Sequence, residues 1–252
     1  MLDINQYRDK NEQMLFLICA IYGGSIWLML IIFTFGIALL FIPFFAGLAW
    51  VSHMYLKAVI YAQAIKVSDQ QYPEINTIVD EQCAALGLKK PDVFLLNGSG
   101  MINAFAMRML SGQFVILYSD LVDLMLEREE MDELKVVIGH ELAHHAAGHT
   151  NLLKSILISP ARGAAFIGPA YSRSCEHTCD RIGAVLGKDI TKAKRALASI
   201  TSGSRALASH INLAALEQQD KEAPQFFITF HEFFSTHPRL IERIRYLDKY
   251  GI

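Results

Sequence analysis

Between Met14 and Ser52 the chain carries 39 consecutive residues without a single Asp, Glu, Lys, Arg or His. Such a run is long enough to cross a bilayer and is much longer than an ordinary core helix of a soluble protein. As one helix it would extend about 58 Å, nearly twice the hydrocarbon thickness of a membrane. We therefore predict two membrane-spanning helices joined by a turn at Thr34-Phe35-Gly36, with Gly23-Gly24 as the alternative turn. The second helix is expected to continue to about Leu56.

The charges that flank this run predict its orientation. Arg8 and Lys10 precede it, Lys57 and Lys66 follow it, and the tip of the expected hairpin carries no charge. Because cytoplasmic segments of membrane proteins are enriched in Lys and Arg, we predict that both ends face the cytoplasm. A cleaved signal peptide is the alternative, but its apolar region would be far shorter.

The sequence therefore divides into a hairpin anchor over residues 1–57 and a cytoplasmic domain over residues 58–252, which is long enough for one hydrophobic core. The whole chain has 23 Lys and Arg against 25 Asp and Glu, so no strongly basic surface is expected to bind nucleic acid. Its four cysteines have no spacing typical of a disulfide framework, which suits a reducing compartment. Cys175 and Cys179 are expected to pack in the interior rather than to bind metal.

The apolar spacing of the second part predicts an α+β domain that is rich in helix and has a small sheet. A further segment, residues 152–171, is apolar, but Lys154 and two prolines divide it into pieces too short to span a membrane. We expect that segment on the surface or at the membrane interface. Helices are expected over residues 72–86, 119–125, 130–147, 174–187, 191–219 and 238–250, and strands over residues 92–96, 103–106 and 113–118.

The helix expected over residues 130–147 carries the sequence His140-Glu141-Leu142-Ala143-His144. Two histidines four residues apart lie on one helical face, about 6 Å apart along the axis, so both rings can reach one metal ion. Glu141 then lies beside the metal, where it can accept a proton from water. This pattern is typical of a zinc peptidase. The alternative is that both histidines only pack or cap the helix.

A tetrahedral zinc with one open position needs a third protein ligand. One candidate is His149, but zinc sites with a following histidine have glycine and histidine where this chain has Ala147 and Thr150. His149 is instead expected near the exposed carbonyls at the helix end. The better candidate is Glu176, which shares a helical face with Asp180. Asp180 would accept the outer N–H of a ligand histidine and so fix its tautomer.

Four motifs in a fixed order carry a resemblance to a known family. The chain resembles the HtpX-like and CAAX prenyl endopeptidase group of membrane zinc peptidases from about Asn103 to Leu247. The matching residues are Asn103-Ala104-Phe105-Ala106, then the HELAHH motif from His140, then Glu176-His177-Thr178-Cys179-Asp180-Arg181, and then Thr236-His237-Pro238 with Arg243-Ile244.

The resemblance implies a gluzincin-type metallopeptidase domain that binds one zinc ion per chain. In this family the zinc ligands correspond to His140, His144 and Glu176, and the base that activates water corresponds to Glu141. By the same resemblance His237 donates a hydrogen bond to the oxyanion formed at the peptide carbonyl. Arg243 is expected to pair with a carboxylate and hold its own segment in place.

The family's other features concern substrate and location. The strand formed by Asn103, Ala104, Phe105 and Ala106 is implied to pair with an extended peptide through its backbone, which tolerates varied sequences. Expected substrates are membrane proteins or unfolded segments near the bilayer. The resemblance further implies a role in membrane protein quality control, in a bacterial inner membrane.

The chain departs from the family in two ways, which affect the predicted membrane segments and the predicted substrate. HtpX-like proteins carry further membrane segments between the zinc helix and the third ligand, whereas residues 152–171 here are not expected to span. The large multi-span chamber of the prenyl endopeptidases is also absent, so a prenylated substrate is not expected. The alternatives are a membrane-tethered binding or scaffold protein with a structural zinc site, and a non-peptidase hydrolase. The presence of Glu141 argues against the scaffold, because a structural site needs no base.

Overall fold

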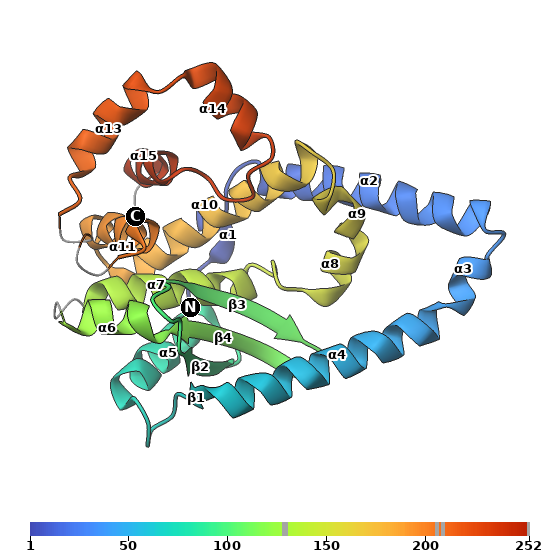
Figure 1. Ribbon diagram of the computed structural model, residues 1–252, viewed down its shortest axis with the longest axis horizontal. Coiled ribbons are helices and arrows are strands. Elements are labelled where there is room, and N and C mark those ends of the chain that lie inside the picture. The colour runs from blue at the N-terminus through green and yellow to red at the C-terminus, as the bar shows by residue number, and fades with distance from the viewer. Residues whose placement is uncertain (128–130, 205–206, 208–209, 251–252) are drawn as a thin grey trace.

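The computed structural model describes residues 1–127, 131–204, 207 and 210–250. A helix-rich body surrounds one small mixed sheet, and two long helices project from it and meet at their far ends (Figure 1). This arrangement confirms the predicted α+β fold with an N-terminal helical hairpin.

The hairpin consists of α2 (Glu12–Phe33) and α4 (Ile42–Gln63), connected by the short helix α3 (Ile37–Leu40). Both long helices are apolar enough to cross a membrane. The turn follows α2 directly, where Phe35 and Gly36 have φ angles of 51° and 81°. The predicted turn is therefore confirmed, and Gly23-Gly24 lies inside α2. The second helix runs seven residues beyond Leu56, so the proposed boundary at residue 57 falls inside α4.

The sheet has the order β1-β2-β4-β3. Strand β2 is parallel to β4, whereas the pairs β1–β2 and β3–β4 are antiparallel. Alternate residues face opposite ways: Val93 and Val115 belong to the main core, while Phe94 and Phe114 pack against Ile60 at the end of α4. The end of α4 thus covers one sheet face. The strands are β1 (Ala64–Lys66), β2 (Asp92–Leu96), β3 (Ala104–Met109) and β4 (Gly112–Tyr118).

The remaining helices confirm most of the predicted segments. The helix predicted over residues 191–219 is wrong as one element, because Gly203 adopts a φ of 61° and ends α11, and Asn212 caps a new helix, α13. Glu130, the predicted start of the zinc helix, lies outside the described residues, and the helices α1, α8, α9 and α14 were not predicted. The helices are α1 (Ile4–Tyr7), α5 (Pro73–Leu86), α6 (Ser119–Glu127), α7 (Met131–Ala146), α8 (Leu152–Leu157), α9 (Ser159–Arg162), α10 (Ile167–Gly187), α11 (Ile190–Ser202), α13 (Leu213–Glu222), α14 (Gln225–Glu232) and α15 (Leu240–Tyr250).

Helices α7 and α10 approach each other closely because glycines lie at their contact. A Cβ atom on Gly183 would lie 2.8 Å from the carbonyl oxygen of Val136, and one on Gly187 would lie 2.3 Å from a methyl group of the same valine. No larger residue fits at Gly183 without a shift of the α7 backbone. This contact brings the face of α10 that carries Glu176 against the histidine face of α7.

The first twelve residues, which we call the N-terminal arm, pack against the body rather than extending away from it. The backbone N–H of Leu2 donates to the carbonyl oxygen of Ala85 over 2.7 Å, and that of Asp9 donates to Oγ1 of Thr178 over 2.8 Å. The start of α2 is therefore fixed against α10.

Candidate metal centre

Three predicted metal ligands meet between α7 and α10. Nε2 of His140 lies 3.5 Å from Oε2 of Glu176, and Nε2 of His144 lies 3.5 Å from Oε1 of the same carboxylate. The two imidazole rings, whose centroids are 5.1 Å apart, are nearly perpendicular. All three potential donor atoms lie within 4.8 Å of one another.

This donor set fits a zinc ion. Metal–ligand bonds of 2.0–2.1 Å in a tetrahedral site separate neighbouring donor atoms by about 3.3 Å, close to the 3.5 Å separations between the carboxylate and the two imidazoles. Two neutral imidazoles and one carboxylate also form the ligand set of known catalytic zinc sites with an open position.

Asp180 and Arg243 support the outer side of His140. Nδ1 of His140 lies 3.0 Å from Oδ1 of Asp180. In the neutral form of the ring that can bind a metal ion, this contact favours the proton on Nδ1 and leaves Nε2 facing the cluster. Arg243 donates to both oxygens of Asp180, over 2.7 and 2.5 Å, which is the carboxylate pair expected from the sequence. Burial alone would raise the pKa of Asp180, but Arg243 and His140 outweigh it and lower this pKa to about 2.

The charges of the cluster depend on one another in the metal-free protein. Burial would lower the pKa of His140, but its bonds to Asp180 and Glu176 raise it to about 10. Burial would likewise raise the pKa of Glu176, whose bonds to His140, His144 and His237 instead hold it well below the usual value. A bound cation would take over the role of the ring protons in compensating the buried carboxylates.

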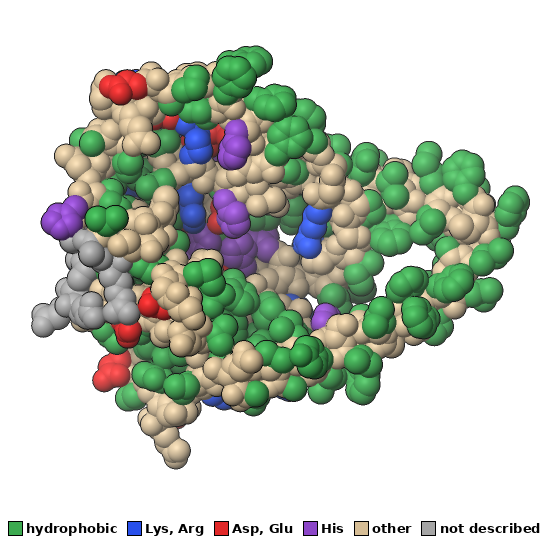
Figure 2. All heavy atoms as spheres, viewed as in Figure 1, with side chains coloured by type: hydrophobic (Ala, Val, Ile, Leu, Met, Phe, Trp, Pro, Cys, Tyr) green, Lys and Arg blue, Asp and Glu red, His purple; other side chains and the backbone are tan. Residues whose placement is uncertain are grey.

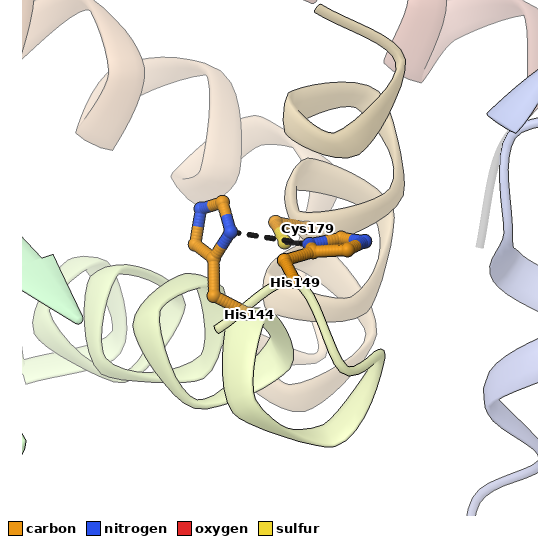
Figure 3. Close-up of side chains that lie close together, drawn as sticks. All are labelled: His144, His149 and Cys179. Atoms are coloured by element: carbon orange, nitrogen blue, oxygen red, sulfur yellow. Dashed lines mark hydrogen bonds between the residues drawn. The ribbon is translucent and has the colours of Figure 1, made fainter. Parts of the chain in front are cut away.

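The outer side of His144 contacts His149, whose surroundings were predicted wrongly from the sequence. The ring of His149 does not lie against the exposed carbonyls at the end of α7. Its Nδ1 is 3.1 Å from Nδ1 of His144 and 3.5 Å from Sγ of Cys179 (Figure 3). Its Nε2 is 3.2 Å from Oε1 of Glu12. Glu12 is distant in sequence, so no local pattern indicated this contact.

The cluster lies in a cleft of about 530 Å³. Glu141 lines the same cleft, as does each of Asn103, Ala104, Phe105 and Ala106. Strand β3, which begins at Ala104, is the outermost strand next to β4, so its other edge is not paired within the sheet. Figure 2 shows histidine side chains gathered in a hollow on the visible face of the molecule.

His237 reaches the cluster from the loop before α15. Its Nδ1 lies 3.4 Å from Oε2 of Glu176, and its side chain is 71% exposed at the cleft. The hydrogen bond to Glu176 raises the pKa of His237, although partial burial opposes this. The remaining nearby histidines face other partners: His145 contacts the carbonyl oxygen of Phe114, and His177 stacks on Tyr246.

Comparison with known proteins places this chain among peptidases. A model described as Peptidase family M48 matches residues 69–159 and 152–250. A protease HtpX homolog from Ralstonia nicotianae is 27% identical over 266 aligned positions, which cover 88% of this chain and 86% of that protein. The homolog from Syntrophobacter fumaroxidans is also 27% identical, over 80% of this chain and 84% of its own length.

Two larger proteins are similar to the chain over part of their length. The plastoglobule-localized metallopeptidase 48 of Arabidopsis thaliana is 24% identical over 62% of this chain, which spans about half (48%) of that protein. The crystal structure of S. mikatae Ste24p superposes with a TM-score of 0.55 at 19% identity, covering 92% of this chain and 63% of that one. This structural likeness concerns the fold alone.

Proposed function

The chain belongs to peptidase family M48, and we propose that it is a membrane-anchored, zinc-dependent endopeptidase. The observation that carries this proposal is the position of Glu141 in the same cleft as the carboxylate and two imidazoles of the metal cluster. A structural zinc site in a scaffold protein would need neither an open cleft nor a base beside the donors.

In this proposal His140, His144 and Glu176 hold one zinc ion, which when bound supplies a Lewis acid for the peptide carbonyl and lowers the pKa of water. Glu141 accepts the proton of the attacking water and passes it to the leaving amine. His237, at the mouth of the cleft, donates a hydrogen bond to the developing oxyanion. Asp180 keeps the ring of His140 in the tautomer that leaves Nε2 free to bind.

The substrate is proposed to be an extended polypeptide that pairs with the free edge of β3. Such pairing uses backbone hydrogen bonds, so it accepts varied side chains but requires an unfolded segment. Asn103, Ala104, Phe105 and Ala106 supply this edge in the cleft that contains the metal donors. Unfolded proteins and unfolded parts of membrane proteins have this property, which supports a role in protein quality control.

Removing and restoring the metal tests the enzymatic proposal. The purified protein in detergent is expected to cleave an unstructured protein such as casein, to lose this activity after a zinc chelator, and to regain it with one equivalent of zinc per chain. A folded, disulfide-bonded protein such as lysozyme serves as a control that should resist cleavage, whereas its reduced and unfolded form should be cleaved. Chelator-resistant cleavage of casein would contradict a metallopeptidase.

We further propose that the hairpin crosses a bacterial inner membrane with the cleft on the cytoplasmic side, in agreement with the flanking Arg8, Lys10 and Lys57. In this orientation helix α8 lies deeper in the membrane than the surface or interfacial position expected for residues 152–171. The indole N–H of Trp27 donates to the carbonyl oxygen of Ile156 over 3.0 Å, and Trp27 is about 20 Å along α2 from the start of the uncharged run. That depth is beyond the middle of a hydrocarbon layer about 30 Å thick.

Side chains of α8 agree with contact to lipid. Leu153 is 78% exposed and Ile156 is 52% exposed, so apolar surface faces outward at this depth. The ammonium group of Lys154 lies 5.3 Å from the centre of the Phe16 ring, near the start of α2. The charge thereby reaches back toward the membrane surface, as long basic side chains do near the ends of a span.

Spin labels measure this depth. A nitroxide at Leu153→Cys is expected to be more accessible to oxygen than to a water-soluble nickel reagent in lipid vesicles, as at Leu48→Cys in α4. The matched control, Gln218→Cys on α13, should show the reverse and should react with an impermeant maleimide only from the cytoplasmic side. The four native cysteines are buried and should label poorly. Preferred access of nickel at position 153 would contradict the proposed depth.

A further inference from the structure

A continuous hydrogen-bond chain joins the metal cluster to the first residue of the membrane helix α2. It runs from His144 through His149 to Glu12, with separations of 3.1 Å between the two Nδ1 atoms and 3.2 Å between Nε2 of His149 and the carboxylate. Figure 3 shows the His144 and His149 rings side by side, with Cys179 of α10 next to them. Glu12 is 2% exposed, so this chain is shielded from water.

The protons along this chain can be assigned from its chemistry. If His144 binds zinc through Nε2, the nitrogen nearest Glu176, its proton must lie on Nδ1. That proton is donated to Nδ1 of His149, whose own proton must then lie on Nε2 and is donated to Glu12. Each ring N–H thus meets one acceptor. His144 is thereby supported on its outer side, as His140 is by Asp180.

Glu12 is itself fixed by residues from two directions. It forms an ion pair with Arg8 and accepts a hydrogen bond from the hydroxyl group of Thr178 on α10. Arg8 also donates to the carbonyl oxygen of Ala147, just beyond the end of α7, over 3.2 Å. The N-terminal arm therefore holds both the carboxylate and the end of the zinc helix in one arrangement.

We propose that His149 and Glu12 are positioning residues for the metal ligand His144, so that the base of the membrane anchor sets the geometry and affinity of the zinc site. This inference rests on the proposed zinc-binding function. It explains why a carboxylate is buried at the start of a membrane helix, where burial of an unpaired charge is costly.

A second ion is the rival explanation of the same side chains. His144, His149 and Cys179 also offer donor atoms within 4.8 Å of one another. Such an ion would require His144 to give up both ring protons and bridge two metals, whereas the hydrogen-bond chain keeps every ring neutral. The chain therefore needs no unusual protonation state.

Zinc affinity, measured by competition with a chromophoric chelator, tests the proposal without relying on activity. His149→Leu removes the acceptor for His144 and is expected to weaken zinc binding by about 10–100-fold, the usual effect of losing an outer partner of a metal ligand. His149→Gln retains an acceptor and should recover part of the loss. Glu12→Gln should also weaken binding. The visible spectrum of the cobalt-loaded protein is expected to change in His149→Leu, because the imidazole of His144 reorients.

The matched control is Asp9→Asn. Asp9 lies in the same arm, is 5% exposed and bonds to Ser174 and Tyr246 but not to His149. Its variant should keep wild-type zinc affinity even if the metal-free protein melts at a lower temperature. Equal loss of affinity in Asp9→Asn and Glu12→Gln would show a general effect of the arm and overturn the proposal.

Two further outcomes would also overturn it. One is that zinc affinity and the cobalt spectrum are unchanged in both Glu12→Gln and His149→Gln. These two variants also provide the test if His149→Leu does not fold. The other is two zinc ions per wild-type chain, falling to one in Cys179→Ser. Absence of any zinc binding by the wild-type protein would instead refute the proposed function itself, so the two failures are distinguishable.

Discussion

Replacing Glu141 with glutamine is expected to reduce the cleavage rate of casein by about 10²–10⁴-fold or more, because the amide cannot accept the proton of the attacking water. Glu141 does not belong to the donor cluster of His140, His144 and Glu176, so zinc content should stay at one ion per chain. The side chains are similar in size, and the fold should be unaffected. Cleavage kinetics together with metal analysis of the purified variant measure both effects.

Asp132→Asn provides a matched control for this substitution. Asp132 lies on the same helix, α7, but pairs with Lys135 on its exposed side. Its variant should cleave casein at the wild-type rate. Undiminished cleavage by Glu141→Gln would refute the assignment of the base, and loss of zinc from that variant would show that Glu141 serves the metal site itself.

Substituting Glu176 with alanine is expected to have the largest effect on the metal. It removes the only carboxylate among the three donors. Loss of an outer partner of a metal ligand weakens binding by up to about 100-fold, and loss of a ligand itself should weaken zinc binding by more than that. Activity should fall with it, because the remaining pair of imidazoles cannot hold the ion at working zinc concentrations. Metal analysis after dialysis and chelator competition quantify this loss.

The neighbouring residue provides the control for this variant. His177 faces away from the cluster and stacks on Tyr246, with ring centroids 4.1 Å apart. His177→Phe preserves this stacking and should bind zinc as the wild-type chain does. If Glu176→Ala retained full zinc affinity, a different residue would have to be the third ligand.

The parts of the fold that the sequence predicted correctly are those specified by local signals. The uncharged run and Gly36 predicted the hairpin, and Gly87, with a φ of 62°, ends α5 where expected. These features depend on the chemistry of a few adjacent residues, so they can be predicted from a single sequence.

The sequence predictions failed where a contact between residues far apart in the chain decides the structure, or where a residue that usually ends a helix occupies a position that tolerates it. Helix α10 begins at Ile167 rather than near residue 174, because Pro169 lies in its first turn, where a missing N–H is harmless. The ring of His149 was expected against the carbonyls at the helix end, yet it bonds to Glu12, which lies far away in sequence. Pairing across such a distance has no signature in local spacing, so the support of His144 could not be predicted.

X-ray absorption at the zinc edge of the zinc-loaded protein identifies the atoms that bind the metal ion. We predict two imidazole nitrogens and oxygen donors at about 2.0–2.2 Å, with no sulfur, as expected for His140, His144, Glu176 and an open position. A sulfur donor at about 2.3 Å would instead place the ion beside Cys179, and a shell of four protein donors would leave no room for water. Either result would contradict the catalytic zinc site on which this account depends.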